Sequence, residues 1–136
     1  MPSLTGGCLC GAIRYSISAP VTELRACHCR NCQRASGAAG TVGAVVPQAA
    51  FRITQGKPKR YSAVADSGRT LHRHFCPDCG SPLYSFREQM PEMIVVRAGT
   101  LDESDGLKIT ANIWTRSARS WAHIDPASKQ FPGQPG

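Results

Sequence analysis

The seven cysteines of this 136-residue chain all fall into three short clusters. The clusters are Cys8-Leu9-Cys10, Cys27-His28-Cys29-Arg30-Asn31-Cys32 and Cys76-Pro77-Asp78-Cys79. Structural zinc sites take four tetrahedral ligands, whereas catalytic zinc sites take three protein ligands and keep one position open. The seven thiols therefore divide into four and three, which predicts one structural and one catalytic zinc.

The spacing of the cysteines predicts which of them share a metal. A single turn can direct the three sulfurs of the central C-x-C-x-x-C cluster toward one metal, whereas each outer pair supplies only half of a tetrahedral site. Thiolate-metal bonds contribute to folding, by about 10–16 kcal/mol in small zinc peptides, so the joined outer pairs would staple the domain. The predicted catalytic centre consists of Cys27, Cys29 and Cys32. The predicted structural centre consists of Cys8, Cys10, Cys76 and Cys79.

A disulfide framework and a redox motif are the alternatives to metal binding. An odd cysteine count leaves one thiol unpaired, and C-x-C spacing suits chelation better than a bridge between its own members. Residues 1–5 lack a signal pattern, so we expect a reducing, cytoplasmic environment. A thioredoxin-like motif needs a helix that starts at Cys76, which residues 80–82 would break. Gly80 instead predicts a tight turn around the metal.

Length and composition predict one domain, residues 1–130, with a frayed tail at residues 131–136. No apolar run approaches the roughly 20 residues that cross a bilayer, so we expect no membrane contact. The formal charge of +7 resembles that of a nucleic-acid-binding protein. Seven thiolates and two Zn²⁺ ions would reduce it to about +4, which weakens that indication. The densest basic group, residues 57–61, is predicted to be an exposed loop because it contains proline and follows Gly56.

Short runs rich in β-branched and aromatic residues predict a mainly β domain of short antiparallel strands. In the clearest of them, Ile13, Tyr15 and Ile17 alternate with polar residues, as in a half-buried strand. The strands are predicted at residues 13–17, 41–46, 51–54, 70–75, 83–86, 93–98 and 110–114. One helix is predicted at residues 31–38, where Gly37 and Gly40 limit it to about two turns.

A histidine that completed the central centre would close it to substrate. His28 lies inside the cluster, where we expect its side chain to point away from the metal. His72 and His74 share a strand face, and a cross-strand polar pair is the interpretation that we favour for them. His123 is the remaining candidate. Trp114 and Trp121 are expected to pack in the core or to cover a cavity.

Three motifs resemble those of the glutathione-dependent formaldehyde-activating enzymes and their centromere protein V relatives. The first is Gly6-Gly7-Cys8-Leu9-Cys10-Gly11-Ala12-Ile13-Arg14-Tyr15, the second is Cys27-His28-Cys29-Arg30-Asn31-Cys32-Gln33-Arg34, and the third is Phe75-Cys76-Pro77-Asp78-Cys79-Gly80-Ser81-Pro82-Leu83. The resemblance extends over about residues 5–100. It implies a β-tent fold with the same structural and catalytic zinc centres that the spacing predicts. It also implies a carbon-sulfur lyase that joins glutathione to formaldehyde.

An open zinc position bound by three thiolates suits thiol chemistry, because an entering thiol would lose its proton beside a carbonyl compound. We therefore expect a small thiol such as glutathione and a small aldehyde as partners. Arg30 and Arg34 flank the central cluster and are predicted to bind substrate carboxylates, since guanidinium matches carboxylate in bidentate geometry. A zinc deaminase is disfavoured because its H-x-E and P-C-x-x-C signature is absent.

The second hypothesis is a non-catalytic zinc module that contacts nucleic acid or protein. The basic balance and the centromere-associated branch of the resemblance favour it. However, the chain lacks a long basic extension, and aromatic residues are not interleaved with the basic group at residues 57–61. Nucleic acid is therefore the less favoured partner.

Overall fold

The computed structural model describes residues 4–135, which form two β-sheets, one α-helix and three 3₁₀ helices. The smaller sheet has the strand order β1-β2-β5, and the larger has the order β11-β10-β3-β4-β9-β8-β7-β6. The smaller sheet comprises β1 (Leu4–Gly7), β2 (Arg14–Ile17) and β5 (Phe51–Gln55). The larger comprises β3 (Leu24–Cys27), β4 (Thr41–Pro47), β6 (Lys59–Val64), β7 (Thr70–Phe75), β8 (Pro82–Arg87), β9 (Met93–Arg97), β10 (Ile109–Ile113) and β11 (Lys129–Gln130). The helices are α1 (Arg30–Ser36), η1 (Gln48–Ala50), η2 (Ala98–Thr100) and η3 (Thr115–Ser117).

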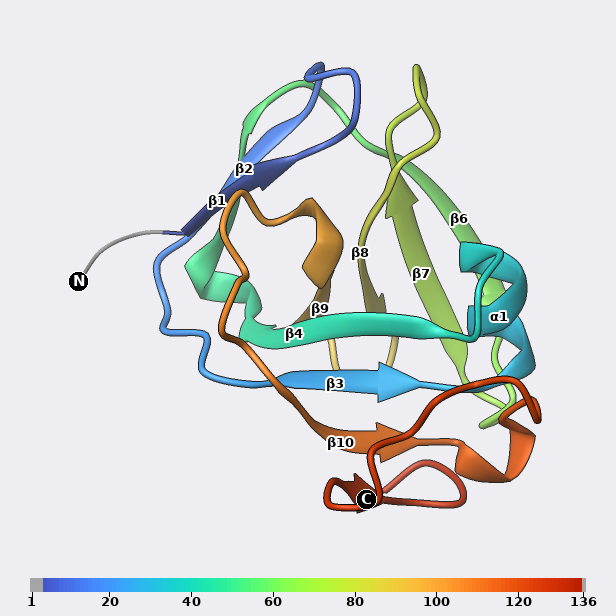
Figure 1. Ribbon diagram of the computed structural model, residues 1–136. Helices are drawn as coiled ribbons and strands as arrows, with labels where there is room; N and C mark the ends of the chain where they lie inside the picture. The colour runs from blue at the N-terminus through green and yellow to red at the C-terminus, as the bar shows by residue number, and fades with distance from the viewer. Residues whose placement is uncertain (1–3, 136) are drawn as a thin grey trace.

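The two sheets and the bend of the larger one give the molecule a tent-like shape. In Figure 1, β3, β4 and β10 run across the view while β7 and β8 stand steeply behind them. Strand β4 makes the connection, because its first half pairs with β3 and its second half pairs with β9. The mainly β fold expected from the sequence and from the resemblance is confirmed. Among residues 4–135, no helix is long and apolar enough to cross a membrane.

The core lies between the two sheets and follows the alternation seen in the sequence. Tyr15 and Ile17 of β2 are buried while Arg14 and Ser16 are partly exposed. The largest fully buried side chains are Tyr15, Ile13, Ile17, Leu83, Ile94, Val46, Val96 and Cys76. Burying one such aliphatic side chain stabilises the fold by about 1.5–3 kcal/mol. The core therefore fixes the strand ends from which the cysteine clusters project.

All seven predicted strands and the predicted helix are present, with ends that differ by at most two residues. Four strands were not predicted, namely β1, β3, β6 and β11. The prediction of an exposed loop at residues 57–61 is wrong for residues 59–61. Only Lys57 and Pro58 form the turn, and β6 begins at Lys59 as an edge strand paired with β7. An edge strand tolerates exposed charged side chains, which hide its β-pattern in the sequence.

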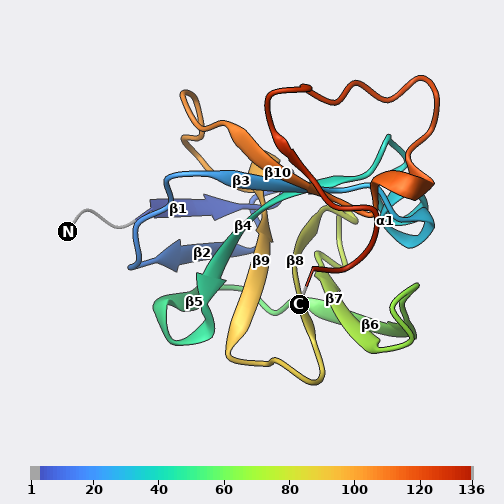
Figure 2. The same ribbon diagram turned by 90° about the horizontal axis from the view of Figure 1, so that it is seen from below.

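Two strand pairs at one edge of the larger sheet are parallel, whereas its other strand pairs are antiparallel. Strand β10 pairs in parallel with both β3 and β11. The segment beyond β11 then lies along the end of β10, where the amide of Phe131 donates to Asn112 O and that of Trp114 donates to Gly133 O. Backbone hydrogen bonds thus extend as far as Gly133, inside the tail at residues 131–136 that is predicted to fray. Figure 2 shows α1 beside the ends of β3 and β10 that lie farther from the N-terminus of the chain.

Candidate metal centres and cavity

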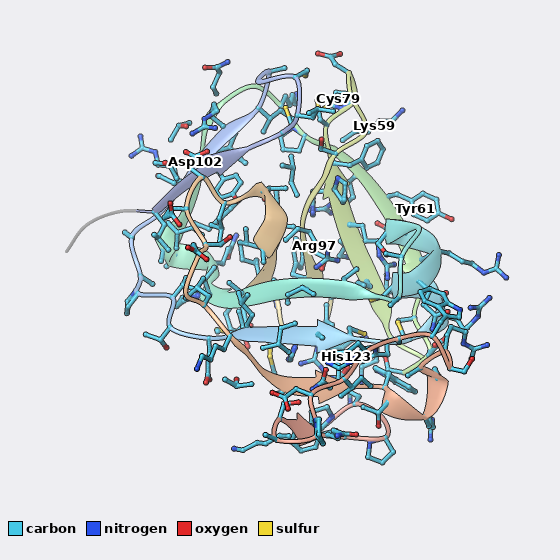
Figure 3. All side chains as sticks on the ribbon, viewed as in Figure 1. Lys59, Tyr61, Cys79, Arg97, Asp102 and His123 are labelled. Carbon is cyan, nitrogen blue, oxygen red and sulfur yellow. The ribbon has the colours of Figure 1, made fainter. Side chains whose placement is uncertain are left out.

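Four cysteines converge where two hairpin turns meet. They come in pairs from the β1–β2 turn and the β7–β8 turn, and Figure 3 shows Cys79 at this end of the molecule. The four sulfur atoms lie within 4.8 Å of one another. Cys10 Sγ lies 3.7 Å from Cys8 Sγ and 3.8 Å from Cys76 Sγ. A tetrahedral zinc with bonds of about 2.3 Å separates its sulfurs by about 3.8 Å, so this cluster fits the ion. The cluster consists of Cys8, Cys10, Cys76 and Cys79.

Both turns have the shape that brings two sulfurs to one point. Gly11 and Gly80 have φ values of 81° and 79°, which only glycine adopts without strain. The Gly80 amide donates to Cys76 O at 2.9 Å, and the Gly11 amide donates to Cys8 O at 3.2 Å. The Ile13 amide donates to Cys8 Sγ at 3.2 Å. The predicted tight turn at Gly80 is confirmed, and no helix begins at Cys76.

The three remaining cysteines converge where β3 runs into α1. Cys27 ends β3, Cys29 caps the N-terminus of α1, and Cys32 lies in its first turn. The Cys32 amide donates to Cys29 Sγ at 3.2 Å, so this sulfur satisfies one of the free donors at the helix start. The three sulfurs lie within 4.8 Å of one another, as three ligands of one zinc require. We call these three residues the triad.

None of the four histidines joins the triad. His28 is buried but turns away, and its Nε2 lies 3.1 Å from Asn112 Oδ1. Across the β6–β7 pair, His72 Nδ1 lies 2.6 Å from Ser62 Oγ, and Arg60 Nε donates to His74 Nε2 at 3.0 Å. The cross-strand interpretation is therefore confirmed, while His123 is exposed at the surface. No fourth His, Cys, Asp or Glu within residues 4–135 completes the group.

The triad lines a cavity of about 170 Å³. One wall is apolar and includes Leu71, Phe86, Val95, Ile113 and Trp114. Four arginines also line it, and sequence analysis did not single them out: Arg25, Arg73, Arg87 and Arg97. Asp66 is the one acidic side chain among the lining residues that the structure describes.

The predicted substrate-binding arginines do not line this cavity. The Arg30 guanidinium donates to Gln33 Oε1, and its backbone amide donates to Asp66 Oδ2 at 3.3 Å. Arg34 is exposed on α1. A helix turns each side chain by about 100°, so the neighbours of Cys32, whose sulfur lies in the triad, point elsewhere. Gln33 is buried and structural, because its amide donates to His28 O at 2.8 Å and to Ser117 O at 3.0 Å.

Trp114 combines burial with an uncommon backbone conformation. It has φ 59° and ψ 37°, and it is the one non-glycine residue with positive φ among residues 4–135. A bulky residue in this region is under strain of about 1–3 kcal/mol, which the surrounding structure must offset. Its ring lies at the cavity and beneath the Arg116 guanidinium, 4.8 Å from the ring centroid. The expectation that Trp114 covers a cavity is confirmed, whereas Trp121 is 68% exposed.

Contacts among the sulfurs make the triad thiols differ in acidity. Hydrogen bonds with Cys29 and Cys32, together with burial, raise the pKa of Cys27. Hydrogen bonds from Cys27 and Cys29 lower the pKa of Cys32 far below its ordinary value, although burial opposes this. Arg73 Nη2 lies 3.9 Å from Cys32 Sγ. A negative charge on the Cys32 sulfur would therefore have a guanidinium group beside it.

Comparison with known families connects these clusters to one group of proteins. The family model described as "Glutathione-dependent formaldehyde-activating enzyme" matches residues 3–117, which include the triad and the cluster of four cysteines. A protein of Halomonas elongata named as a candidate enzyme of that kind is 31% identical over 104 residues. The match covers 73% of this chain and 66% of the relative.

Other comparisons agree over shorter or more distant matches. A Podospora anserina protein with the same candidate name is 29% identical over 85 residues, covering 61% of this chain and 39% of the relative. The chain thus spans from about two fifths to just under two thirds of these relatives' lengths. A crystal structure of a Rhodobacter sphaeroides protein has a TM-score of 0.60 at 21% identity, covering 78% of this chain and 99% of that one. That likeness confirms the fold.

Proposed function

Because the chain belongs to the glutathione-dependent formaldehyde-activating enzyme family, we propose that it is a zinc-dependent, carbon-sulfur lyase-like enzyme. It would add a small thiol, such as glutathione, to a small aldehyde, or release the aldehyde from the adduct. The observation that carries this proposal is the triad, which has three sulfurs at a cavity and no fourth ligand from residues 4–135. Three protein ligands and an open position are typical of catalytic zinc.

The two clusters would have different roles. The cluster of four sulfurs has the ligand number of a closed structural zinc site. The triad would hold the catalytic zinc, and Zn²⁺ there would lower the pKa of an entering thiol so that it reacts as thiolate. The thiolate sulfur would donate its electron pair to the carbonyl carbon and form the C–S bond. The carbonyl π pair would move to oxygen, which takes up a proton, and the reverse path would release the aldehyde.

The chain's own residues would favour this reaction by position and by environment. The apolar lining, which includes Leu71, Phe86 and Val95, would reduce the water around a bound substrate and so strengthen electrostatic interactions there. Arg73 beside Cys32 would offset the net negative charge of three thiolates and one Zn²⁺. The turn of β3 into α1 fixes the three sulfurs on short, hydrogen-bonded backbone, which favours a preorganised site.

The direct test is turnover by the fully zinc-loaded protein with glutathione and formaldehyde, followed by other small thiols and aldehydes. The Cys29→Ser variant keeps an oxygen that can cap α1 but removes one triad sulfur. We expect it to lose turnover by at least about a hundredfold, with one zinc fewer per chain and an unchanged circular dichroism spectrum.

Two results would overturn the proposal. Wild-type protein with two bound zincs and no turnover across the thiol and aldehyde panel would argue for a non-catalytic module. Full activity in Cys29→Ser would remove the triad from the reaction. Unfolding of Cys29→Ser would instead assign Cys29 to a structural site, which contradicts its proposed role.

A further inference from the structure

Four arginines reach the cavity from four different strands of the larger sheet. Arg25 lies on β3, Arg73 on β7, Arg87 on β8 and Arg97 on β9. The strand register aligns two of them, because Gly43 of β4 pairs with Arg25 on one side and with Arg97 on the other. Figure 3 shows Arg97 near the middle of the molecule, whereas Lys59 and Tyr61 lie at its outside. The sheet thus gathers positive charge in its interior.

The cavity arginines lack the carboxylate partners that guanidinium groups inside a protein normally have. Arg97 is buried, and Arg25, Arg73 and Arg87 are partly buried. Within residues 4–135, none of the four has a carboxylate within 4.0 Å. Arg73 Nε and Arg87 Nη1 are buried with no hydrogen-bond partner, and Arg97, only 9% exposed, donates through Nη2 to Ser85 Oγ at 3.2 Å. A buried donor without a partner is unfavourable, so the unpaired nitrogen atoms of Arg73 and Arg87 favour a ligand in the cavity.

Metal binding at the triad would not neutralise this charge. Three thiolates and one Zn²⁺ carry a single negative charge, and Asp66 adds another. Four guanidinium groups therefore leave the cavity with two uncompensated positive charges.

From these contacts we infer that the cavity selects a compact thiol carrying two carboxylate or equivalent oxyanion groups close to its sulfur. Two negative charges balance the cavity, and guanidinium groups recognise such oxyanions in bidentate geometry. The inference rests on the proposed function, in which the thiol sulfur enters at the triad. It names the arginines of the cavity as the residues that determine which thiol is used.

The volume of the cavity and the distance from Arg73 to the triad both indicate a compact ligand. The cavity of about 170 Å³ is well below the roughly 300–1,000 Å³ of pockets for drug-sized ligands. Arg73 Nη2 is 3.9 Å from Cys32 Sγ, so an oxyanion held by Arg73 lies beside the sulfur cluster. The anionic groups and the reacting sulfur would therefore be only a few bonds apart.

The test compares mercaptosuccinate, which has two carboxylates, with neutral 1-thioglycerol, using calorimetric titration of fully zinc-loaded protein. We expect mercaptosuccinate to bind at least about a hundredfold more tightly than 1-thioglycerol, with 3-mercaptopropionate between them. Arg25→Gln and Arg87→Gln should each reduce this ratio by about tenfold or more. The matched control Arg52→Gln, which removes an exposed arginine of β5, should leave the ratio unchanged.

Each variant is judged by the ratio of its affinities for mercaptosuccinate and 1-thioglycerol. A general loss of structure weakens both affinities, whereas a loss of carboxylate recognition lowers the ratio. A wild-type ratio near one, no binding of any of the three thiols, or a ratio unaffected by both Arg25→Gln and Arg87→Gln would overturn the inference. Equal turnover with neutral and dianionic thiols would overturn it while leaving the proposed function intact. Selective binding of mercaptosuccinate without turnover with any aldehyde would support the inference as a binding property and reject the proposed reaction.

Discussion

Gly80 shapes the outer cysteine cluster through its backbone alone. Its φ is 79°, and a Cβ added there would meet no atom within 4 Å. A residue with a side chain pays about 1–2 kcal/mol for this left-handed conformation. We therefore expect Gly80→Ala to lower the free energy of unfolding of the zinc-loaded protein by about that amount, measured by urea denaturation.

The control for Gly80→Ala is Gly99→Ala. A Cβ at Gly99 would also meet no atom within 4 Å, but its φ is not positive, so the substitution should be neutral or stabilise the protein by up to about 1 kcal/mol. Equal effects of the two substitutions would mean that the left-handed turn is not what fixes Cys76 and Cys79.

The grouping of the cysteines could be predicted from sequence because each of the three short cysteine runs is local, and close spacing limits where its sulfurs can point. The two outer runs could be joined because each supplies only half of a tetrahedral site. The cavity arginines could not be predicted, because Arg73, Arg87 and Arg97 come together only through the order of β7, β8 and β9. Arg25 had one available signal. It lies two residues before Cys27, and alternate residues of a strand share a face, but β3 was not predicted.

Strand β10 holds the triad in place through one buried side chain. Asn112 is 3% exposed and connects three segments. Its Oδ1 lies 3.1 Å from His28 Nε2, and its Nδ2 donates to Ser128 Oγ at 2.7 Å and to Lys129 O at 3.2 Å. The residue thus links the C-terminal segment to the turn that carries Cys27 and Cys29.

We expect Asn112→Ala to lower the free energy of unfolding by about 1–3 kcal/mol, because it leaves His28 Nε2 buried without its partner. Thiol binding at the triad should weaken as well, since the turn loses its fixed position. Urea denaturation and calorimetry would measure both effects. The control Thr110→Ala removes an exposed hydrogen bond to Glu23 and should change stability little. If Asn112→Ala lost no more stability than this control, Asn112 would not hold the triad in place.

The strand elements could be predicted where alternation was strong, as in β2 and β7. Strand β11 has only two residues, and its parallel pairing with β10 depends on a connection of more than a dozen residues. Local propensity contains no information about such a pairing. The same connection returns the chain to β10, which is why the segment after residue 130 is held as far as Gly133.

The outer cysteine cluster acts at the scale of the whole molecule because it joins the two sheets. One pair lies at the end of β1 in the smaller sheet, and the other lies between β7 and β8 in the larger sheet. A metal there closes a contact between residues 66 positions apart, from Cys10 to Cys76. The triad, by contrast, spans only six residues of sequence, so a metal there would not cross-link the two sheets.

The central claim is that one of two metal centres is open to a thiol. Protein in which Co²⁺ replaces both zincs would be titrated with mercaptosuccinate while its visible absorption is recorded. The account predicts that the bands of one Co²⁺ per chain change and saturate, while those of the other stay constant, and that Cys29→Ser abolishes the change. A spectrum that does not respond to thiol, although two Co²⁺ ions are bound per chain, would contradict the account.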